Sequence, residues 1–279
     1  MLAKAGHENF PVALRLLPMR YRRHLTAVYA YARTVDDIGD LAPPGERAGL
    51  LDEIEADVGR LYAPAGPAWP ASPAGPMLPA VAGLAGTVAE CGVPRAALTD
   101  LIEANRQDQL VARYQTFDDL LGYCRLSANP VGRIVLHVFG AWTPERAVLS
   151  DRVCTGLQLA EHWQDVAEDF RAGRIYLPLD DLREYGCDEA DLDREHATAE
   201  LRGLLAFEVA RARALIDAGA PLIGTLRGAA RLAVAGYVAG GRAALAAIAA
   251  AGYDVLAGAP KPSKAATVAG LASAWARAR

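Results

Sequence analysis

The chain has 279 residues, of which 52% are apolar, and a formal net charge of −4 at pH 7. A chain of this length and composition can bury a large core, and its weak negative charge argues against a nucleic-acid-binding protein. Its four cysteines are far apart and show no Cys-x-x-Cys or Cys/His spacing. This pattern argues against a zinc site or a disulfide framework and predicts buried, reduced thiols.

The N-terminal segment lacks the uninterrupted apolar core and the cleavage-site pattern of a signal peptide. No stretch of the sequence reaches the roughly 18 uncharged apolar residues that a membrane-spanning helix needs. We therefore expect a cytoplasmic protein, with peripheral contact to the inner membrane as an open alternative.

Helical periodicity dominates the sequence, because apolar residues recur at steps of three and four and no convincing strand alternation is present. We expect an all-α fold with a single domain over residues 1–279. The expected helices, in chain order, are 11–17, 19–40, 46–61, 78–90, 94–114, 116–126, 133–141, one that starts at Pro144, 198–218 and 226–251. Between them we expect a Pro-rich surface loop at 63–76 and an irregular acidic stretch at 179–197, and after them a basic tail at 260–279 with a short helix around Trp275.

One acidic cluster lies in the segment 159–178, which contains Glu161, Asp165, Glu168 and Asp169. Steps of three and four place these carboxylates on one broad face of a helix. Carboxylates at this spacing repel one another by a few tenths of a kcal/mol per pair, so the cluster favours a positive partner between them. A divalent cation is the simplest candidate.

A second acidic cluster closes the helix expected at 19–40, where Tyr29, Arg33, Asp36 or Asp37, and Asp40 fall on one face. A solvated helix end would explain this cluster if it stood alone, although aspartates at a helix C-terminus oppose the macrodipole. Two such clusters facing each other would form an oxygen-rich Mg²⁺ site. Arginines such as Arg33 and Arg174 would then hold a diphosphate leaving group.

These residues resemble the two aspartate-rich motifs of the squalene and phytoene synthases. The first match is Tyr29-x3-Arg33-x2-Asp36-Asp37-x2-Asp40, and the second is Gln164-Asp165-x2-Glu168-Asp169-x4-Arg174-x-Tyr176-x-Pro178. Two further segments are also similar to the family: Tyr123-Cys124 with Asn129-Pro130-Val131-Gly132, and Gly252-Tyr253-Asp254-Val255-Leu256. The resemblance covers nearly the whole chain and implies the isoprenoid (terpenoid) synthase fold, with helices around a central apolar cavity.

Within the family, residues 8–13, 123–133 and 162–165 are most similar to the bacterial hydroxysqualene synthases of hopanoid pathways. This resemblance implies Mg²⁺-dependent ionisation of presqualene diphosphate, rearrangement of the cation and capture by water to give hydroxysqualene. It implies about two or three Mg²⁺ ions bound with the diphosphate and no need for NADPH. It also implies functional links to a presqualene diphosphate synthase and a hydroxysqualene dehydroxylase.

Two alternatives stay open at this point. The chain could be a squalene or phytoene synthase that joins two prenyl diphosphates head to head. It could also be a non-catalytic homologue that serves as a pathway scaffold, because Glu161 stands where the family usually has Asn.

The resemblance also assigns roles to individual residues. The implied metal ligands are Asp36, Asp40, Glu161, Asp165 and Asp169. The implied catalytic residues are Tyr123, Arg33, Asp36 and Asp165. The implied substrate-binding residues are Tyr29, Arg33, Arg174, Tyr176 and Asn129. Asp108 matches a recurrent acid of the family, and we expect His162 to pack on another face of its helix.

Overall fold

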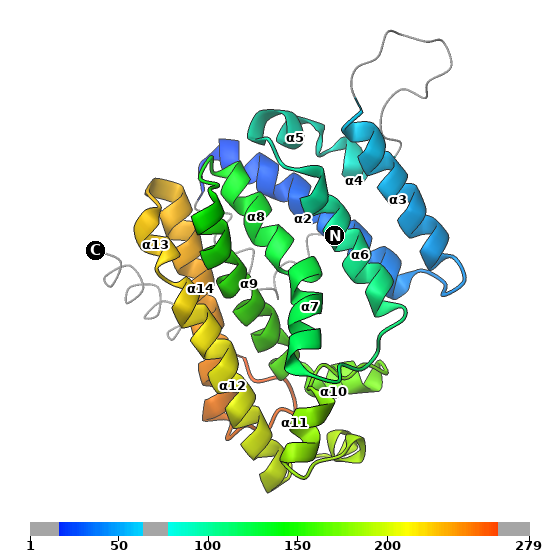
Figure 1. Cartoon of the computed structure of the whole chain (residues 1–279), viewed down its shortest axis with the longest axis vertical. Coiled ribbons are helices and arrows are strands. Elements are labelled where there is room, and N and C mark those ends of the chain that lie inside the picture. Colours follow the sequence, from blue (N-terminus) through cyan, green and yellow to red (C-terminus); the bar gives the residue numbers. More distant parts are fainter. Residues whose placement is uncertain (1–16, 64–77, 262–279) are drawn as a thin grey trace.

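The computed structural model of the chain describes residues 17–63 and 78–261. Within these residues the regular structure is helical, apart from one isolated parallel bridge between Arg113 and Ile175. The elements (Figure 1) are α2 Met19–Leu41, α3 Arg47–Leu61, α4 Pro79–Ala82, α5 Ala85–Cys91, α6 Arg95–Asp108, α7 Phe117–Ser127, α8 Asn129–Val138, α9 Pro144–Gln164, α10 Val166–Arg171, α11 Leu179–Glu184, the 3-10 helix Glu189–Asp193, α12 Ala199–Gly219, α13 Leu222–Thr225 and α14 Gly228–Ala250. The predicted all-α fold is confirmed.

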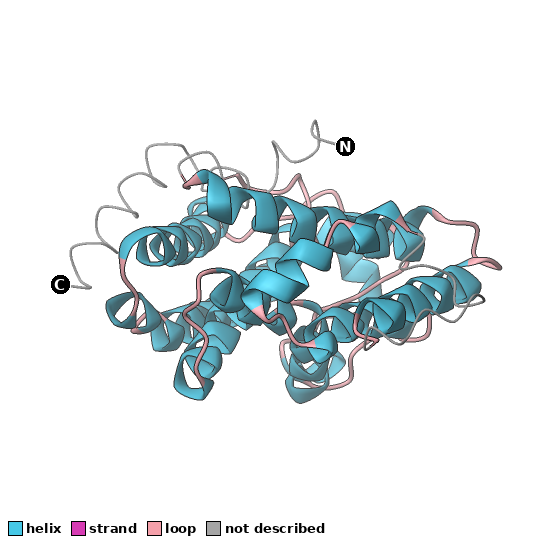
Figure 2. Ribbon diagram, turned by 90° about the horizontal axis from the view of Figure 1, so that it is seen from above, coloured by secondary structure: helices cyan, strands magenta, loops and turns pink. Residues whose placement is uncertain are grey.

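Helix α9 is the centre of the arrangement. It packs against α8, α12 and α14, while α2 and α3 pack against α6 on the other side of the molecule (Figure 1). Figure 2 shows the same helices from above. Trp163 of α9 and Tyr31 of α2 are among the largest fully buried side chains of the two hydrophobic clusters that result. Their burial supplies apolar stabilisation on both sides of α9.

Glycines allow α9 to approach its neighbours closely. A Cβ atom added at Gly156 would lie 2.6 Å from Cγ1 of Ile216 on α12, and one added at Gly241 of α14 would lie 2.5 Å from Cδ2 of Leu157. Both distances are shorter than van der Waals contact, so a larger side chain would push the helices apart. At these positions the small residues therefore serve helix packing.

Helix α14 is the one helix, among the described residues, that is long and apolar enough to cross a membrane by length and composition. In its most apolar window, 61% of the residues are buried inside the protein. Its contacts with α9 and α12 explain this burial, as in the core helix of a globular fold.

Two expected helices differ from the observed ones. The prediction of one helix over 78–90 was wrong, since α4 and α5 are separate. The prediction of one helix over 94–114 was wrong in its C-terminal part, where α6 ends at Asp108. Beyond it, the N–H of Ile175 donates to the carbonyl of Ala112 at 2.9 Å, and that of Leu179 donates to Tyr114 at 2.9 Å. These long-range bonds replace further helical bonds.

Other boundaries follow from local chemistry. Helix α8 begins at Asn129 rather than 133, because Pro130 lies in the first turn, where its missing N–H is tolerated. The stretch 179–197, expected to be irregular, contains α11 and the 3-10 helix, and a capping box of Asp188 and Asp191 starts the latter. Helix α14 starts at Gly228 rather than 226, after the short α13.

Several expectations concern residues outside the described part of the chain. They are the helix at 11–17 apart from its last residue, nearly all of the loop at 63–76 and most of the tail at 260–279. The limits of a single domain over 1–279 stay a prediction. All four cysteines are free, with Cys124 and Cys187 buried and Cys91 and Cys154 partly buried.

Candidate active site

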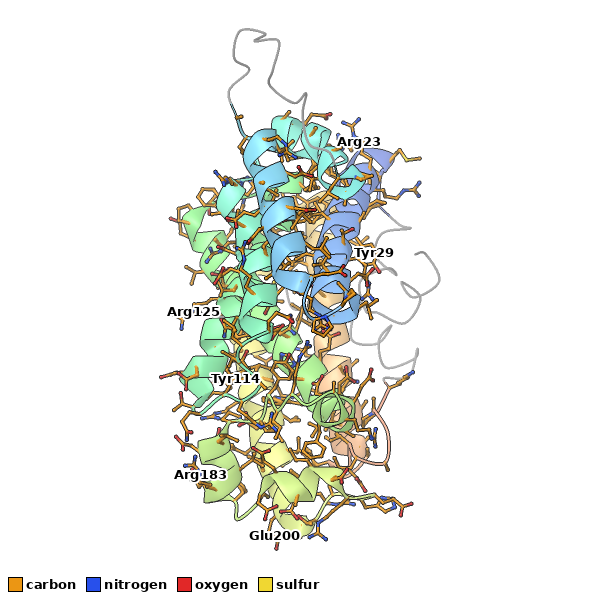
Figure 3. The ribbon with its side chains drawn as sticks, turned by 90° about the vertical axis from the view of Figure 1, so that its right-hand side faces the viewer. Arg23, Tyr29, Tyr114, Arg125, Arg183 and Glu200 are labelled. Atoms are coloured by element: carbon orange, nitrogen blue, oxygen red, sulfur yellow. The ribbon has the colours of Figure 1, made fainter. Side chains whose placement is uncertain are left out.

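The first acidic motif occupies the C-terminal half of α2. Arg33 pairs with Asp37, with Nη2 and Oδ1 2.7 Å apart, rather than with Asp36. Asp36 instead accepts a hydrogen bond of 3.3 Å from Nδ2 of Asn105 on α6. Figure 3 shows Tyr29 on α2, and its helical spacing places it on the face that carries Arg33.

Asp36 is exposed on the C-terminal half of α2, with protein atoms close around it. Loss of hydration raises the pKa of its carboxyl to about 6. The Asn105 hydrogen bond opposes this shift, and the Asp40 charge adds to it. A bound cation would offset both unfavourable effects.

The second acidic motif spans a break between two helices. Helix α9 ends at Gln164, and Asp165, with φ −103° and ψ 13°, separates it from α10. The prediction of one continuous helix was therefore wrong. Helical hydrogen bonds nevertheless continue on both sides of the break: the N–H of Asp165 donates to the backbone carbonyl of Glu161 at 3.0 Å, and the N–H of Asp169 donates to the backbone carbonyl of Asp165 at 2.8 Å. Burial, followed by the charges of Asp169 and Glu168, raises the pKa of Asp165 to about 6.

Arg174 joins the two motifs. Its backbone N–H donates to the carbonyl of Asp169 at 2.9 Å, and its Nη2 donates to Oδ1 of Asp40 at 2.9 Å. Gly173, with φ of 85°, makes the turn that brings this arginine back toward α10. The two motifs, 134 residues apart at Asp40 and Arg174, thus meet at one residue, whose guanidinium group contacts the first motif and whose backbone contacts the second.

Aromatic rings lie beside this junction. The Tyr123 hydroxyl donates to Oδ2 of Asp108 at 2.7 Å, and the Tyr123 ring lies 5.8 Å from that of Tyr176. Burial, followed by the Asp108 charge, raises the pKa of Tyr123 well above its ordinary value, so its hydroxyl stays protonated. Burial also raises the pKa of Asp108, although the bond from Tyr123 opposes this. Oδ1 of Asp108 is buried and has no hydrogen-bond partner among the described residues.

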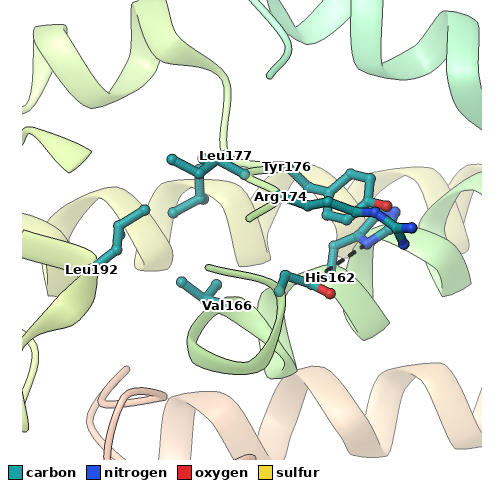
Figure 4. A pocket seen from close by; sticks show the side chains of 8 residues that line it. His162, Val166, Arg174, Tyr176, Leu177 and Leu192 are labelled. Carbon is teal, nitrogen blue, oxygen red and sulfur yellow. Dashed lines mark ion pairs between the residues drawn. The ribbon is translucent and has the colours of Figure 1, made fainter. Parts of the chain in front are cut away.

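His162 has a larger part in the site than its helical position predicts. Its ring stacks on Tyr176, with centroids 3.7 Å apart and planes at 16° (Figure 4). Its Nδ1 lies 3.9 Å from Oδ2 of Asp169, and its Nε2 lies 3.2 Å from Nε2 of Gln158. A pocket of about 10 Å³, roughly the room of one water, is enclosed between His162, Arg174, Tyr176 and neighbouring apolar side chains. The sequence signal is a histidine next to a presumed ligand, which predicts either packing or a supporting contact to the site.

Two residues to which the resemblance assigns a role in the site, Asn129 and Glu161, lie away from the junction of the motifs or on the protein surface. Asn129 is buried, and its Oδ1 accepts a hydrogen bond of 3.0 Å from Thr155 on α9. In the described part of the chain, the side-chain hydrogen bond of Asn129 is thus with α9 rather than with the acidic motifs. Glu161 is exposed on the last turn of α9. Their roles stay predictions.

The donor set fits a hard cation shared with a ligand. Within the described residues, no three His, Cys, Asp or Glu side chains gather closely enough to hold a metal ion by themselves. Mg²⁺ characteristically keeps several waters and uses one or two carboxylates together with substrate phosphates. Burial is the largest cause of the raised pKa values of Asp36 and Asp165, and a cation at this place would favour their charged forms.

A sequence profile described as squalene/phytoene synthase matches residues 3–266 of the chain. The chain belongs to the squalene/phytoene synthase family. The predictions of this family and of an enzyme of this kind are thereby confirmed.

Three relatives illustrate the similarity. A hydroxysqualene synthase from Rhodopseudomonas palustris is 34% identical over 224 residues, which are 79% of this chain and 72% of the relative. A phytoene synthase from Mycobacterium tuberculosis is 31% identical over 229 residues, which are 80% of this chain and 71% of the relative. The crystal structure of squalene synthase HpnC from Alicyclobacillus acidocaldarius is 41% identical and has a TM-score of 0.81, with 90% of this chain and 92% of that chain covered. The predicted isoprenoid synthase fold is confirmed by this match.

Proposed function

We propose that this enzyme converts presqualene diphosphate into hydroxysqualene, with Mg²⁺, and releases diphosphate. The observation that carries the proposal is the position of Arg174, which is bonded to both acidic motifs beside the aromatic rings. The similarity to hydroxysqualene synthases supports the choice of substrate within the family.

The acidic side chains and the arginines would bind the diphosphate end of the substrate. Mg²⁺ would be held by Asp36, Asp40, Glu161, Asp165 and Asp169, as proposed ligands, and when bound it neutralises charge that develops on the leaving group. Arg174 and Arg33 present guanidinium groups that can donate to phosphate oxygens in a charge-assisted, bidentate manner. Arg174 would exchange its bond to Asp40 for one to phosphate.

The aromatic side chains would face the hydrocarbon part, where positive charge develops. Tyr123 and Tyr176 are aromatic rings that attract a cation, and the His162 ring covers one face of Tyr176. Neither tyrosine is a reactive base, since burial keeps both hydroxyls protonated. When water forms its C–O bond with the cation, one proton must leave that water. Oδ1 of Asp108, which is buried and open to a donor, is the acceptor we assign, and the raised pKa of Asp108 suits this step.

A second candidate is head-to-head condensation of two prenyl diphosphates, which the similarity to phytoene synthases supports. The other alternative from the sequence, a pathway scaffold without turnover, rests on Glu161 in place of Asn, and the match to a family of enzymes opposes it. Each candidate makes a different demand on substrate and reductant, so one assay separates them.

The test supplies purified protein with farnesyl, geranylgeranyl or presqualene diphosphate, each with Mg²⁺ and with or without NADPH. We expect hydroxysqualene from presqualene diphosphate alone, without NADPH and with loss of product in EDTA. Product from farnesyl or geranylgeranyl diphosphate would favour condensation. Absence of any turnover, with the protein folded, would favour the scaffold.

The proposed reaction also defines the chemical neighbours of the enzyme. A presqualene diphosphate synthase must supply its substrate, and a hydroxysqualene dehydroxylase would consume its product. We propose a cytoplasmic enzyme. Because both the substrate chains and the product are long hydrocarbons, we also propose peripheral contact with the inner membrane. Flotation with anionic vesicles, with and without substrate, measures that contact.

A further inference from the structure

Negative charge accumulates at the C-terminal end of α2, and side chains from other segments donate hydrogen bonds to it. Free carbonyls and the negative end of the macrodipole coincide there with the aspartates of the first motif. Three carbonyls at this end receive side-chain donors: Gly39 from Nε2 of Gln109 at 3.1 Å, Asp40 from Nη2 of Arg47 at 3.0 Å, and Ala42 from Nε of Arg47 at 2.8 Å. Side chains from α3 and from just beyond α6 thus cap α2.

These donors are bonded to one another and to the first motif. Nη1 of Arg47 donates to Oε1 of Gln109 at 2.9 Å, and Nε2 of Gln109 also donates to the carbonyl of Asn105 at 3.0 Å. Nδ2 of Asn105 in turn donates to Asp36 at 3.3 Å. We call Arg47, Asn105 and Gln109 the α2-end network.

Close packing makes α2 dependent on this network. A Cβ atom added at Gly39 would lie 2.1 Å from Oδ1 of Asn105, so α2 lies against the amide group at a distance that only glycine allows. Asn105 is itself buried, at 8% exposure, and its Nδ2 is also bonded to the Leu101 carbonyl at 3.1 Å. The amide therefore has a defined position against the last turns of α2, beside Asp36 and Gly39.

The proposal rests on the diphosphate site proposed above. We propose that Asn105 and Gln109, supported by Arg47, are positioning residues that hold the last turn of α2 so that Asp36 and Asp40 face Mg²⁺ and diphosphate. They act through hydrogen-bond donation and do not contact the substrate. The Asn105 amide binds one oxygen of Asp36 and leaves the other available to a cation.

The chemistry of these residues explains why amides occupy these places. The Asn105 amide donates to Asp36, and the Gln109 amide donates to the Gly39 carbonyl while accepting from Arg47. A carboxylate at either position could only accept. Glutamate at position 109 would keep the pairing with Arg47 but could not donate to Gly39. Aspartate at position 105 would keep the shape of Asn105 but place a like charge beside Asp36.

The experiment compares Gln109→Glu and Asn105→Asp with the wild type. Binding of Mg²⁺ with inorganic pyrophosphate is measured by titration calorimetry, and folding by circular dichroism and Tm. We expect binding of the Mg²⁺–pyrophosphate pair to weaken about tenfold in both variants, since each loses a hydrogen bond near charged groups. Gln115→Glu is the matched control: Gln115 is exposed and bonded to Asp180, and we expect its variant to bind within about twofold of the wild type.

The outcomes separate this inference from the proposed function. Wild-type binding together with equal binding by Gln109→Glu and Asn105→Asp would overturn the positioning role alone. Failure of the wild type to bind Mg²⁺ and pyrophosphate would overturn the diphosphate site and this inference with it. If one variant does not fold, the other decides, and Arg47→Lys, which keeps the charge but makes fewer bonds, is expected to weaken binding in the same direction.

Discussion

The two acidic motifs have similar side chains in different surroundings. On the continuous helix α2, nitrogen donors meet each aspartate: Arg33 at Asp37, Asn105 at Asp36 and Arg174 at Asp40. At the break between α9 and α10, burial, followed by the like charges of Asp169 and Glu168, raises the pKa of Asp165, and the basic group in contact is His162, 3.9 Å from Asp169. The protein therefore places more nitrogen groups beside the side chains of the first motif than beside those of the second, although burial raises the pKa of Asp36 as well as that of Asp165 to about 6.

The largest expected effect comes from removing Asp165, because the second motif has fewer nitrogen groups beside its side chains. Asp165→Ala should lower kcat/KM at least about 100-fold, beyond the usual loss for residues that only support ligands. Steady-state kinetics with presqualene diphosphate measure this, and Asp193→Ala, at an exposed carboxylate of the 3-10 helix, is the control. A loss below tenfold would contradict the assigned role of Asp165.

The next effect concerns Arg174, which connects the motifs. Arg174→Lys keeps the charge but loses the planar fork, so we expect kcat/KM to fall about 10- to 100-fold, with weaker pyrophosphate binding. Arg171→Lys, three residues earlier and exposed, should behave as the wild type. Equal behaviour of the two variants would show that the junction of the motifs is not used in binding.

The third prediction is a pH dependence. The pKa of both Asp36 and Asp165 is raised to about 6, so both carboxyls gain protons as pH falls below that value and lose affinity for Mg²⁺. We expect kcat/KM to rise with pH up to about 6 and then level off, with a loss of about tenfold per pH unit below 6 for each essential ionisation. A profile that is flat from pH 5 to 8 would contradict this.

A smaller effect of opposite sign is expected for stability without metal. Since folding raises the pKa of Asp165, the folded state holds a proton between about pH 4 and 6 that the unfolded state releases, and stability falls as pH rises through this window. Asp165→Asn should therefore raise Tm by about 2–4 °C in EDTA at pH 7.5 if it recovers about 1 kcal/mol. Mg²⁺ with pyrophosphate should stabilise the wild type more than this variant. A lower Tm in EDTA would contradict the prediction.

The smallest effect is expected at Glu161, which is exposed on the last turn of α9. Glu161→Asn keeps an oxygen donor and restores the residue usual in the family, so Mg²⁺-dependent turnover should stay within about threefold of the wild type. Glu161→Ala should lose more, with a higher Mg²⁺ requirement. If neither variant changes turnover or Mg²⁺ dependence, Glu161 is not a ligand.

Much of the helical fold was predictable because its helices carry local signals. The buried stripe of Leu25, Val28 and Val35 marks α2, and Thr116 with Asp119 starts α7 as a capping box. By contrast, the end of α6 at Asp108 depends on hydrogen bonds between residues 112–114 and 175–179. Periodicity carries no information on such distant partners.

For the site, the amino-acid sequence alone determined the two acidic motifs and the side chains that belong to them, because motif spacing is a property of residues close together in the chain. The resemblance of these motifs to known ones indicated the family. Only the tertiary structure decided the partners of these side chains: Arg174 at Asp40, His162 on Tyr176, and Asn105 at Asp36. The Arg174–Asp40 and Asn105–Asp36 pairs each join segments far apart in the chain. The balance of charge in the site therefore depends on how closely those segments pack.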